Sequence, residues 1–553
     1  MRRFLIKALF TFVVLAMLAP PVFAQAPAPK VTITGLFDQI TSAGRNFYDG
    51  DLTRSSDREW YARTRFRPDF EFSVGRVKAV LGLEIDLQYG QAGPNDGGFP
   101  GNNSGTNSGC KVNSNGCLDL NTDVGGMIEI KWIYTEFPLT GKDSLLPFIP
   151  VETMARAGGQ PFGRLANYKI VYANGDFAGV SAVTTFAPNI KTNLAYVILE
   201  DQLAGANRGI GAAKITRGED YAVIVSPEIT PFKGLDLKPL FSWFHADGVT
   251  ASGARHHVVD IHFAGPANTR DTPTAQTTNS AAALGGGAAA GDPTYHEDRY
   301  TVGLDARWRS GPFGFDPTFY YQWGQRDHRA VKTDGSVGKV QADMSSWIVD
   351  LIGSFSTGPL LLEARVVYSP GNKARDNLTK SVRYFQQLDE DGGYWSSWAA
   401  LLANGGIDYF NGQLLTNMGR HIGYDRYGRA GLGFRATYSI TPALAVYTWV
   451  SPTWTAEKVD TDTGALPGTG ASAVSRTTLD EQSWVKGDSR YIGTEVDLGL
   501  TYRFAPNVAF DLQGAYLLAG DALGTAEVPS GGVHTRREPD DAYMVAARVR
   551  IAF

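Results

Sequence analysis

The sequence predicts an all-β protein, a transmembrane antiparallel up-and-down β-barrel of about eighteen strands, with sixteen as the alternative count. Three observations predict it. Apolar and polar residues alternate with period two in many segments, and short and long connections alternate between these segments. Beyond the first 24 residues, no run of the sequence is apolar enough for a membrane-spanning helix.

The first 24 residues are typical of an export signal. They begin with the basic stretch MRRFLIK, continue through a short apolar core and end in Ala24. This order marks a cleavable signal peptide. The alternative is a membrane anchor, but the apolar run is shorter than the ~20 residues that a spanning helix needs. We therefore expect residues 1–24 to be removed and residues 25–553 to form the barrel.

The alternation is clear between residues 60 and 74. Phe66 and Phe72 fall on one face of this segment, and Arg63 and Arg65 fall on the other. Side chains alternate across a strand, so the segment has an apolar face and a charged face. We count eighteen segments of this kind, which start near Val31, Trp60, Val77, Met127, Val151, Phe177, Lys191, Asp220, Leu235, Asp298, Phe315, Ser346, Leu360, Ala430, Ala443, Arg490, Asn507 and Asp541.

The connections between the segments alternate in length. Short ones, rich in Pro, Gly or Asn, lie at 75, 187–190, 230–234, 310–314, 356–359, 441–442 and 505–507, and a longer turn lies at 138–150. Long polar connections lie at 42–58, 91–124, 158–176, 201–219, 247–297, 327–345, 370–428, 455–489 and 520–540. An up-and-down barrel has short periplasmic turns on one rim and long extracellular loops on the other. Because a bilayer leaves no partner for unpaired backbone groups, we expect the sheet to close.

Large aromatic residues recur close to the predicted strand ends. They are Trp60, Tyr89, Trp132, Tyr134, Trp243, Tyr300, Trp308, Tyr321, Trp323, Trp347, Tyr368, Tyr438 and Tyr502. Trp and Tyr favour the headgroup boundary of a membrane, so their repetition at strand ends predicts an aromatic girdle. The alternative for any one of them is ordinary packing within a sheet.

The last strand carries a family resemblance. Residues 541–553 (DAYMVAARVRIAF) alternate apolar and polar side chains and end on Phe553. This pattern resembles the closing strand of bacterial outer-membrane β-barrels, in which the final Phe is part of the assembly signal. The resemblance implies a multi-pass barrel in the outer membrane of a Gram-negative bacterium. It also implies outer-membrane lipid and lipopolysaccharide as surroundings, and the barrel-assembly machinery as a partner through Phe553.

A second resemblance concerns the preceding hairpin. The stretch YIGTEVDLGLTYRFAPNVAFDLQGAYLLAGDAL resembles the C-terminal hairpin of alginate-export-type outer-membrane barrels, which have eighteen strands. The opening VTITGLFDQI is similar to first strands of general diffusion porins. The hairpin covers about thirty residues, and the middle of the chain offers no comparable motif. The transported solute therefore stays open.

Composition and cysteine content exclude several classes of protein. The formal net charge of −5 gives no support for nucleic-acid binding, and the mean hydropathy of −0.17 is compatible with half-apolar barrel strands. The two cysteines, Cys110 and Cys117, close a short Gly/Asn/Ser loop. In an exported protein such a pair predicts a disulfide. Two cysteines alone make a poor zinc site, and no c-type haem motif occurs.

If the apolar face meets lipid, the charged face lines a pore. The predicted pore-lining residues are Arg63, Arg65, Arg67, Lys78, Glu84, Asp86, Arg307, Arg309, Glu363, Arg365, Arg435, Glu495, Asp497 and Arg503. The two signs nearly balance, and opposed charges create a transverse field that favours ions and polar solutes. The alternative is simple pairing across strands. Arg63, Arg65 and Arg67 form a basic ladder, which we expect to contact anions.

A barrel of sixteen to eighteen strands leaves a wide channel, which something must narrow. The leading candidate is the connection 370–428, in which Trp395 and Trp398 stand at helix-like spacing with two leucines. We expect this connection to fold inward as a constriction loop. The alternatives are a plug, an external cap or a contact between protomers. Its acidic run, formed by Asp389, Glu390 and Asp391, could hold Ca²⁺, but the spacing does not match an EF-hand loop.

Five of the eight histidines gather around the connection 247–297. They are His245, His256, His257, His262 and His296. Their spacing is irregular and no cysteine accompanies them, so exposed loop histidines are favoured over metal ligands. The sequence therefore predicts no metal site and no bound cofactor, apart from the weak Ca²⁺ candidate.

These observations favour a water-filled porin channel through which ions and small polar solutes diffuse. The alternative is a substrate-specific channel for an anionic oligosaccharide or polysaccharide, which the hairpin resemblance implies. An enzyme is not favoured, because the chain has no nucleophile motif such as GxSxG. A sleeve around an electron-carrying partner is disfavoured by the predicted inward loop. A homotrimer and a monomer both remain open.

Overall fold

The structure is a computed structural model. It describes residues 28–46, 52, 58–89, 128–173, 175–201, 218–250, 253–255, 294–331, 337–373, 376, 380–388, 395, 397–403, 405–407, 427–459, 489–527 and 535–553. The predicted signal peptide at 1–24, the pair Cys110 and Cys117, and the acidic run at 389–391 lie outside these residues. Within them, no helix is both long enough and apolar enough to cross a membrane.

In the described part of the chain, eighteen long strands form the barrel. They are β1 (Lys30–Arg45), β2 (Arg58–Val74), β3 (Val77–Tyr89), β4 (Ile128–Thr140), β5 (Glu152–Pro161), β6 (Asp176–Ala187), β7 (Ile190–Asp201), β8 (Gly218–Phe232), β9 (Leu235–Gly248), β10 (His296–Ser310), β11 (Phe313–Val331), β12 (Val337–Thr357), β13 (Leu360–Ser369), β15 (Arg429–Ser439), β16 (Leu444–Val459), β17 (Ser489–Ala505), β18 (Val508–Ala519) and β21 (Ala542–Ala552).

The remaining described elements are short. They are α2 (Gly163–Ala166), η2 (Gly253–Arg255), β14 (Ser381–Val382), η6 (Asp521–Leu523), β19 (Thr525–Glu527) and β20 (Thr535–Arg537). Strand β14 pairs in parallel with β12, and β19 pairs with β20 in a small separate sheet.

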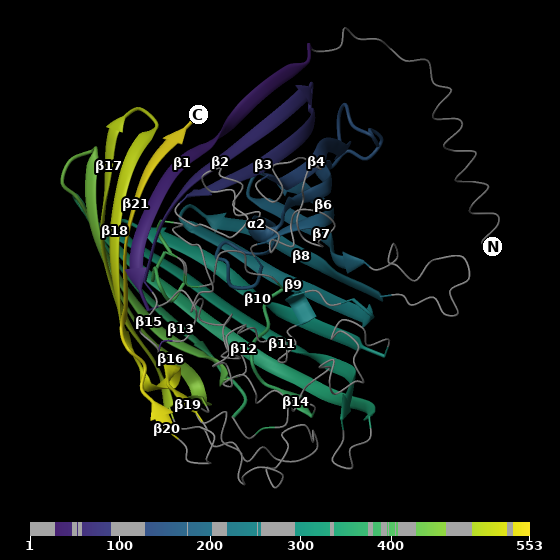
Figure 1. Cartoon of the computed structure of the whole chain (residues 1–553). Helices are drawn as coiled ribbons and strands as arrows, with labels where there is room; N and C mark the ends of the chain where they lie inside the picture. The colour runs from purple at the N-terminus through teal and green to yellow at the C-terminus, as the bar shows by residue number, and fades with distance from the viewer. Residues whose placement is uncertain are drawn as a thin grey trace, which may run out of the picture.

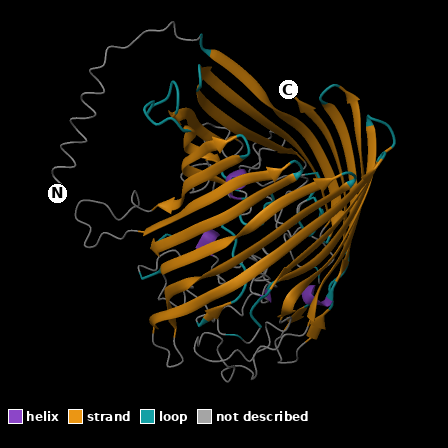
Figure 2. Ribbon diagram, turned by 180° about the vertical axis from the view of Figure 1, so that it is seen from behind, coloured by secondary structure: helices purple, strands orange, loops and turns teal. Residues whose placement is uncertain are grey.

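The long strands form a closed antiparallel barrel. Each pairs with the long strand that follows it along the chain, and β1 pairs with both β2 and β21. Figure 1 shows the first strand beside the last, and Figure 2 shows the tilted strands curving around the barrel from the opposite side. The prediction of an eighteen-stranded up-and-down barrel is confirmed.

The seam between β1 and β21 ends on the last residue. Gly35 and Phe553 exchange two backbone hydrogen bonds of 2.9 and 3.1 Å, and the Phe553 ring stacks on Phe66 at 5.9 Å between centroids. A Cβ atom at Gly35 would collide with the carbonyl oxygen of Arg67 and lie 2.9 Å from the Phe553 ring. Glycine at position 35 therefore lets the first and last strands approach each other.

The two faces of the barrel differ as the alternation predicts. On β1 the apolar side chains of Ile33 and Phe37 are 52% and 37% exposed on the outside, whereas Asp38 and Ser42 on the inner face are each 2% exposed. Trp308, Tyr321 and Trp323 are also exposed on the outer face. This arrangement, apolar outside and polar inside, is the reverse of that in a soluble protein. It matches a barrel with lipid outside and polar groups inside.

Two aromatic residues depart from the predicted girdle, Trp132 and Tyr134, and both lie on the inner face, where Arg156 covers the Tyr134 ring. The register between β3 and β4 shifts at Gly82/Leu83, and this irregularity turns Trp132 onto the inner face. Its indole Nε1 donates to Asp69 at 3.0 Å, and its ring occupies the space that a side chain at position 82 would need. A β-bulge changes the face of the sheet on which the following side chains lie. The apolar/polar alternation of the sequence does not reveal such a bulge.

The strand starts were predicted within two residues, with one exception. Strand β12 begins at Val337 and not near Ser346, and its partner β11 continues to Val331. The outward side chains at this end, such as Gln325 and Asp343, are polar, so the apolar alternation stops while the backbone pairing continues. The predicted loop 327–345 is largely a hairpin.

We predict that Gly35→Ala weakens closure of the barrel. The new Cβ would strike the Arg67 carbonyl and the Phe553 ring, and overpacking of this kind costs about 1–3 kcal/mol. The measurement is the urea concentration at which half of the protein is unfolded. The folded fraction is read from the difference in gel mobility between the folded and the heat-unfolded barrel. The matched control is Gly353→Ala on β12, where an added Cβ meets nothing within 4 Å. Equal midpoints for the two variants would contradict the seam argument.

Candidate functional site

The inner wall beside the seam carries a row of alternating charges. Arg550 on β21 donates to Asp38 on β1 at 2.6 and 2.5 Å. In the next strands, Arg65 lies opposite Asp38 and donates to Asp86 at 2.7 and 2.6 Å. Strand register thus places basic and acidic groups at one level around four strands, β21, β1, β2 and β3.

The predicted basic ladder on β2 lies against acidic residues of β3. Arg63 lies 3.6 Å from Asp86, and Arg65 and Arg67 lie 2.9 and 2.7 Å from Glu84. These pairs neutralise most of the positive charge of the ladder locally, because each of the three arginines lies at ion-pair distance from a carboxylate. The ladder therefore faces the lumen as a set of ion pairs. Its contact with a permeating anion stays a prediction.

The other predicted pore-lining residues fall into three settings. Lys78 pairs with Glu71 at 3.2 Å, Arg365 with Asp350 at 2.5 Å and Arg435 with Glu363 at 2.6 Å. Arg309 pairs with Asp316 and is 52% exposed at the short-turn rim, where Arg503 is also exposed. The side chains of Glu495 and Asp497 are 0% exposed and hold another segment of the chain, as described below.

A first segment, the described part of residues 162–175, connects β5 to β6 and folds into the barrel. Phe162, Val171 and Tyr172 are each 0% exposed. The side chain of Asn167 braces the segment, because its amide donates to the carbonyls of Gly163 and Ala173 at 2.8 and 3.0 Å and its oxygen accepts from Tyr172 N at 3.0 Å. A single asparagine thus satisfies backbone groups that a sheet ladder would otherwise pair.

The wall carboxylates and the 162–175 segment bind each other. Asp305 on β10 accepts from the backbone N–H groups of Tyr168 and Lys169 at 2.7 and 2.9 Å. The ammonium of Lys169 donates to the carbonyls of Asp316 and Asp350 at 2.7 and 2.9 Å. Burial lowers the pKa of Lys169 below its ordinary value, and the carboxylates of Asp350 and Asp305 oppose that shift.

Arg307, another predicted pore-lining residue, also contacts this segment. Its guanidinium donates to the Tyr168 carbonyl at 3.1 Å and lies 4.3 Å from the centre of the Tyr168 ring. The sequence had assigned 158–176 to an external loop. The apolar and aromatic content of FGRLANYKIVY was the signal that could have revealed an inward segment, because such residues need a surface to cover them.

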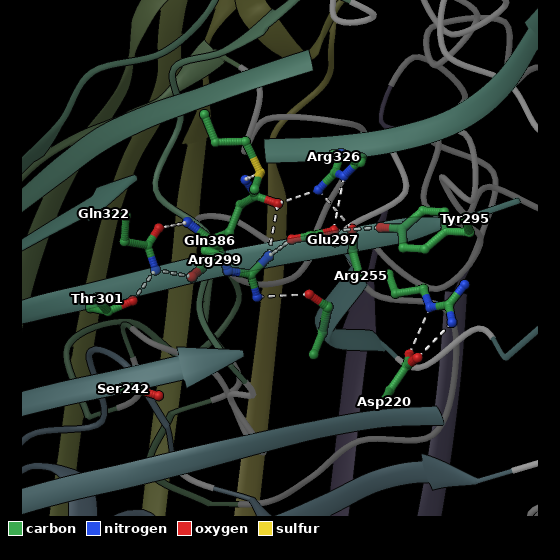
Figure 3. Close-up of polar contacts among 12 residues, drawn as sticks. Asp220, Ser242, Arg255, Tyr295, Glu297, Arg299, Thr301, Gln322, Arg326 and Gln386 are labelled. Atoms are coloured by element: carbon green, nitrogen blue, oxygen red, sulfur yellow. Dashed lines mark hydrogen bonds and ion pairs between the residues drawn. The ribbon is translucent and has the colours of Figure 1, made fainter. Parts of the chain in front are cut away.

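A second segment, the described part of 380–407, connects β13 to β15 in the chain and lies against the inner wall of β10–β18. Gln386 reaches a buried cluster in which Arg299 and Arg326 both donate to Glu297, at 2.7 and 2.9 Å (Figure 3). The side-chain oxygen of Gln386 accepts from both arginines at 3.1 and 2.6 Å. Gln322 completes the anchor by bonding the backbone N–H and C=O of Gln386 at 2.8 and 2.6 Å.

The two predicted tryptophans of this segment stack on wall arginines. Arg365 lies 4.5 Å from the Trp395 ring centre, and Arg435 lies 4.8 Å from that of Trp398. Trp398 occupies the space above Gly433, where a Cβ would lie 2.5 Å from the indole. Cation–π contacts of this kind are strongest where water is excluded, and Trp395 is 0% exposed.

The helix expected around Trp395 and Trp398 is absent from the described residues 395, 397–403 and 405–407, which form turns. Ser397 has a φ of 70°, which no α-helix accommodates. The backbone N–H groups of 400, 401 and 402 donate to the carboxylate of Glu495 at 2.6, 2.6 and 2.7 Å. Because a wall carboxylate takes these donors, they are not used for helical hydrogen bonds.

Asp497 and Gln513 extend this anchor along β17 and β18. Gln513 donates to Asp497 at 3.3 Å and accepts from Ile407 N at 3.0 Å. Glu495 and Asp497 thus lie on the inner face, where the segment covers them. Whether the segment narrows the channel stays a prediction.

A cavity of about 660 Å³ lies on the inner wall of β4–β6 beside α2. Lys131, Arg156 and Arg164 bring positive charge to its lining, and Glu136 and Asp176 bring negative charge. Glu136 accepts from Arg156 at 2.6 Å. The ring of Trp132 lies 5.2 Å below the Lys131 ammonium. Cations beside an aromatic face can hold a small polar solute that carries negative charge. Arg164 lies in the inward segment and was missed by strand counting.

No family model and no curated protein matches the chain. The chain is similar to solved structures that include OccK8 (OprE) of Pseudomonas aeruginosa, at 11% identity and a TM-score of 0.46, with 95% of this chain and 98% of that one covered. A BenF-like porin from Pseudomonas fluorescens Pf-5 is similar at 9% identity and 0.44, with coverage of 95% and 98%. The outer membrane protein OpdK of Pseudomonas aeruginosa is similar at 9% and 0.42, with the same coverage.

We predict that Glu495→Gln loosens the 395–407 segment. An amide cannot accept three backbone hydrogen bonds as a carboxylate does, and charged hydrogen bonds contribute about 1.5–3 kcal/mol. Amide hydrogen exchange at residues 400–402 should therefore accelerate roughly thirtyfold, which corresponds to about 2 kcal/mol. Asp511→Asn is the control, since the bonding partners of Asp511 are Thr501 and Arg548 on the wall. Unchanged exchange in Glu495→Gln would show that the carboxylate does not hold the segment.

Proposed function

We propose that the chain is a porin of the bacterial outer membrane, forming a water-filled channel for ions and small polar solutes. The observation that carries the proposal is the closed ring of eighteen strands with apolar side chains outside and paired charges inside. Rings of sixteen to eighteen strands leave an aqueous passage. Diffusion through such a passage needs no bound cofactor and no catalytic group.

The surroundings follow from the same polarity. The outer apolar face contacts lipid and, on the rim with long connections, lipopolysaccharide. The terminal Phe553 matches the assembly signal of outer-membrane barrels, so the barrel-assembly machinery is the proposed partner for insertion. Both roles rest on the alternation and on the resemblance of the last strand.

A second candidate is a conduit for an anionic polymer, of the alginate-export type. The resemblance of the C-terminal hairpin favours it, and so does the excess of cations over carboxylates, three against two, in the cavity beside β4–β6. A polymer conduit needs basic groups along its whole path. The pairing of Arg63, Arg65 and Arg67 with Asp86 and Glu84 reduces that positive field and favours the general channel.

Liposome swelling separates the two candidates. We expect reconstituted protein to admit neutral mono- and disaccharides, at rates that fall with solute size. Swelling by anionic oligosaccharides alone would favour the polymer conduit and overturn the general channel. No swelling by any solute would overturn both.

We predict that Lys131→Gln combined with Arg164→Gln slows a small sugar acid relative to the neutral sugar of the same size. Two solvated charges contribute about 0.5 kcal/mol each, so the ratio of swelling rates should fall roughly fivefold. Lys339→Gln is the matched control, since Lys339 lies on the outer face and pairs with Asp327. An unchanged ratio would remove the cavity from the solute path.

We predict that replacing residues 384–418 by a short Gly/Ser linker raises single-channel conductance in planar bilayers. The described part of this loop fills space on the inner wall of β10–β18, which ions could then use. Trp395→Ala combined with Trp398→Ala is a milder version that keeps the chain length. If both variants conduct like the parent protein, the loop is not a constriction.

A further inference from the structure

Two histidines and one aspartate meet on the outside of the barrel, at the rim with long connections. His245 lies near the end of β9, and His296 and Asp298 lie at the start of β10. The ladder places Asp298 opposite His245 and places His296 opposite Asp247. The inner-face neighbours Glu297 and Arg299 are 0% exposed, so alternation directs the three residues outward.

The donor atoms lie close enough to share one ion. His245 Nδ1 is 2.9 Å from Asp298 Oδ1, and His296 Nε2 is 3.2 Å from Asp298 Oδ2. One donor atom from each of the three residues lies within 4.8 Å of the others. With bonds of about 2.0–2.1 Å, neighbouring ligand atoms of tetrahedral zinc stand roughly 3.4 Å apart. Small side-chain rotations would bring all three donors to that spacing.

A neighbouring indole orients the carboxylate. Trp243 Nε1 donates to Asp298 Oδ1 at 2.8 Å, which leaves Oδ2 available on the side of His296. Hydrogen bonds from a second layer of residues fix metal-ligating carboxylates in this way. The two imidazole rings lie edge to face at 5.2 Å between centroids, so both already converge on Asp298.

The three residues are accessible from water. The side chains of His245, Asp298 and His296 are 16%, 31% and 46% exposed. His296 and Asp298 line an outer groove that runs past Tyr300 and Trp323, whose stacked rings mark the aromatic girdle. An ion in the headgroup layer can therefore reach them without entering hydrocarbon.

We propose that His245, His296 and Asp298 bind one divalent transition-metal ion, with Zn²⁺ as the best match. Two imidazoles and one carboxylate suit this class of ion better than Ca²⁺ or Mg²⁺, which favour all-oxygen sites. A water molecule completes the coordination, and Asp247 lies 3.9 Å from the other ring nitrogen, Nδ1, of His296, where it can orient the imidazole. The ion bridges β9 and β10 at the point where the long connection 249–295 leaves the barrel.

This site goes beyond the channel, because it lies on the outer surface. The sequence predicted no metal site, because the histidines are irregularly spaced and no cysteine accompanies them. Pairing of β9 with β10 brings His245 and His296 together. His256, His257 and His262, which the sequence grouped with them, lie outside the described residues.

Zn²⁺ titration of the full chain in detergent tests the proposal. The starting protein carries His256→Gln, His257→Gln and His262→Gln, so that other histidines near the rim do not contribute. Calorimetry should give one Zn²⁺ per chain. Loss of a second-layer partner typically costs about 10–100-fold in metal affinity, so His245→Gln and Asp298→Asn, which remove direct ligands, should each weaken binding by more than about 100-fold.

Asp316→Asn serves as the matched control, because it removes a carboxylate of the same barrel from the opposite rim. Its affinity for Zn²⁺ should equal that of the starting protein. The gel mobility shift on heating verifies that each variant is folded. Absence of saturable Zn²⁺ binding by the starting protein, or equal binding by the ligand variants, would overturn the site.

Discussion

Closure of the backbone hydrogen-bond ring is the constraint on which the rest of this structure depends. Hydrocarbon offers no partner to an N–H or C=O group, so a spanning sheet can leave no edge. The β1–β21 ladder removes both edges, and the exchange of bonds between Gly35 and Phe553 completes it. Once the ring is closed, every strand has one face toward lipid and one toward the lumen. The period-two pattern then decides which residues become available to a solute.

The charged inner wall also determines where the inward segments lie. Asp305, Asp350 and Glu495 are 0% exposed, and a carboxylate buried to that degree needs hydrogen-bond or ionic partners. Asp305 and Glu495 obtain them from backbone N–H groups of the two inward segments, and Asp350 obtains them from Arg365 and Lys169. The carboxylates of the wall and the backbone N–H groups of the segments therefore supply each other's hydrogen-bond partners. Residues that appear from their strand position to line a pore act here as anchors.

The sequence predicted what depends on local pattern and missed what depends on distant partners. The strands, their count and their facing follow from alternation over 10 or so residues, which is a local property. The inward turn of Trp132 depends on a register shift against β3. The turns at residues 397–403 depend on Glu495, almost a hundred residues later in the chain. The spacing of tryptophans and leucines suggested a helix there. That spacing contains no information about a wall carboxylate that accepts hydrogen bonds from three backbone N–H groups.

The two inward segments contact each other within the barrel. Leu388 N donates to the Tyr172 carbonyl at 2.8 Å, and Tyr320 on β11 contacts the rings of both Tyr172 and Phe385. Their described contacts run along the wall from β8 to β18, and Arg164 of the first segment also lines the cavity on β4–β6. The first segment thus links the filled part of the wall to the cavity. In the proposed channel, Lys131, Arg156 and Arg164 would attract a solute with negative charge to this cavity, because electrostatic attraction is stronger beside protein than in bulk water.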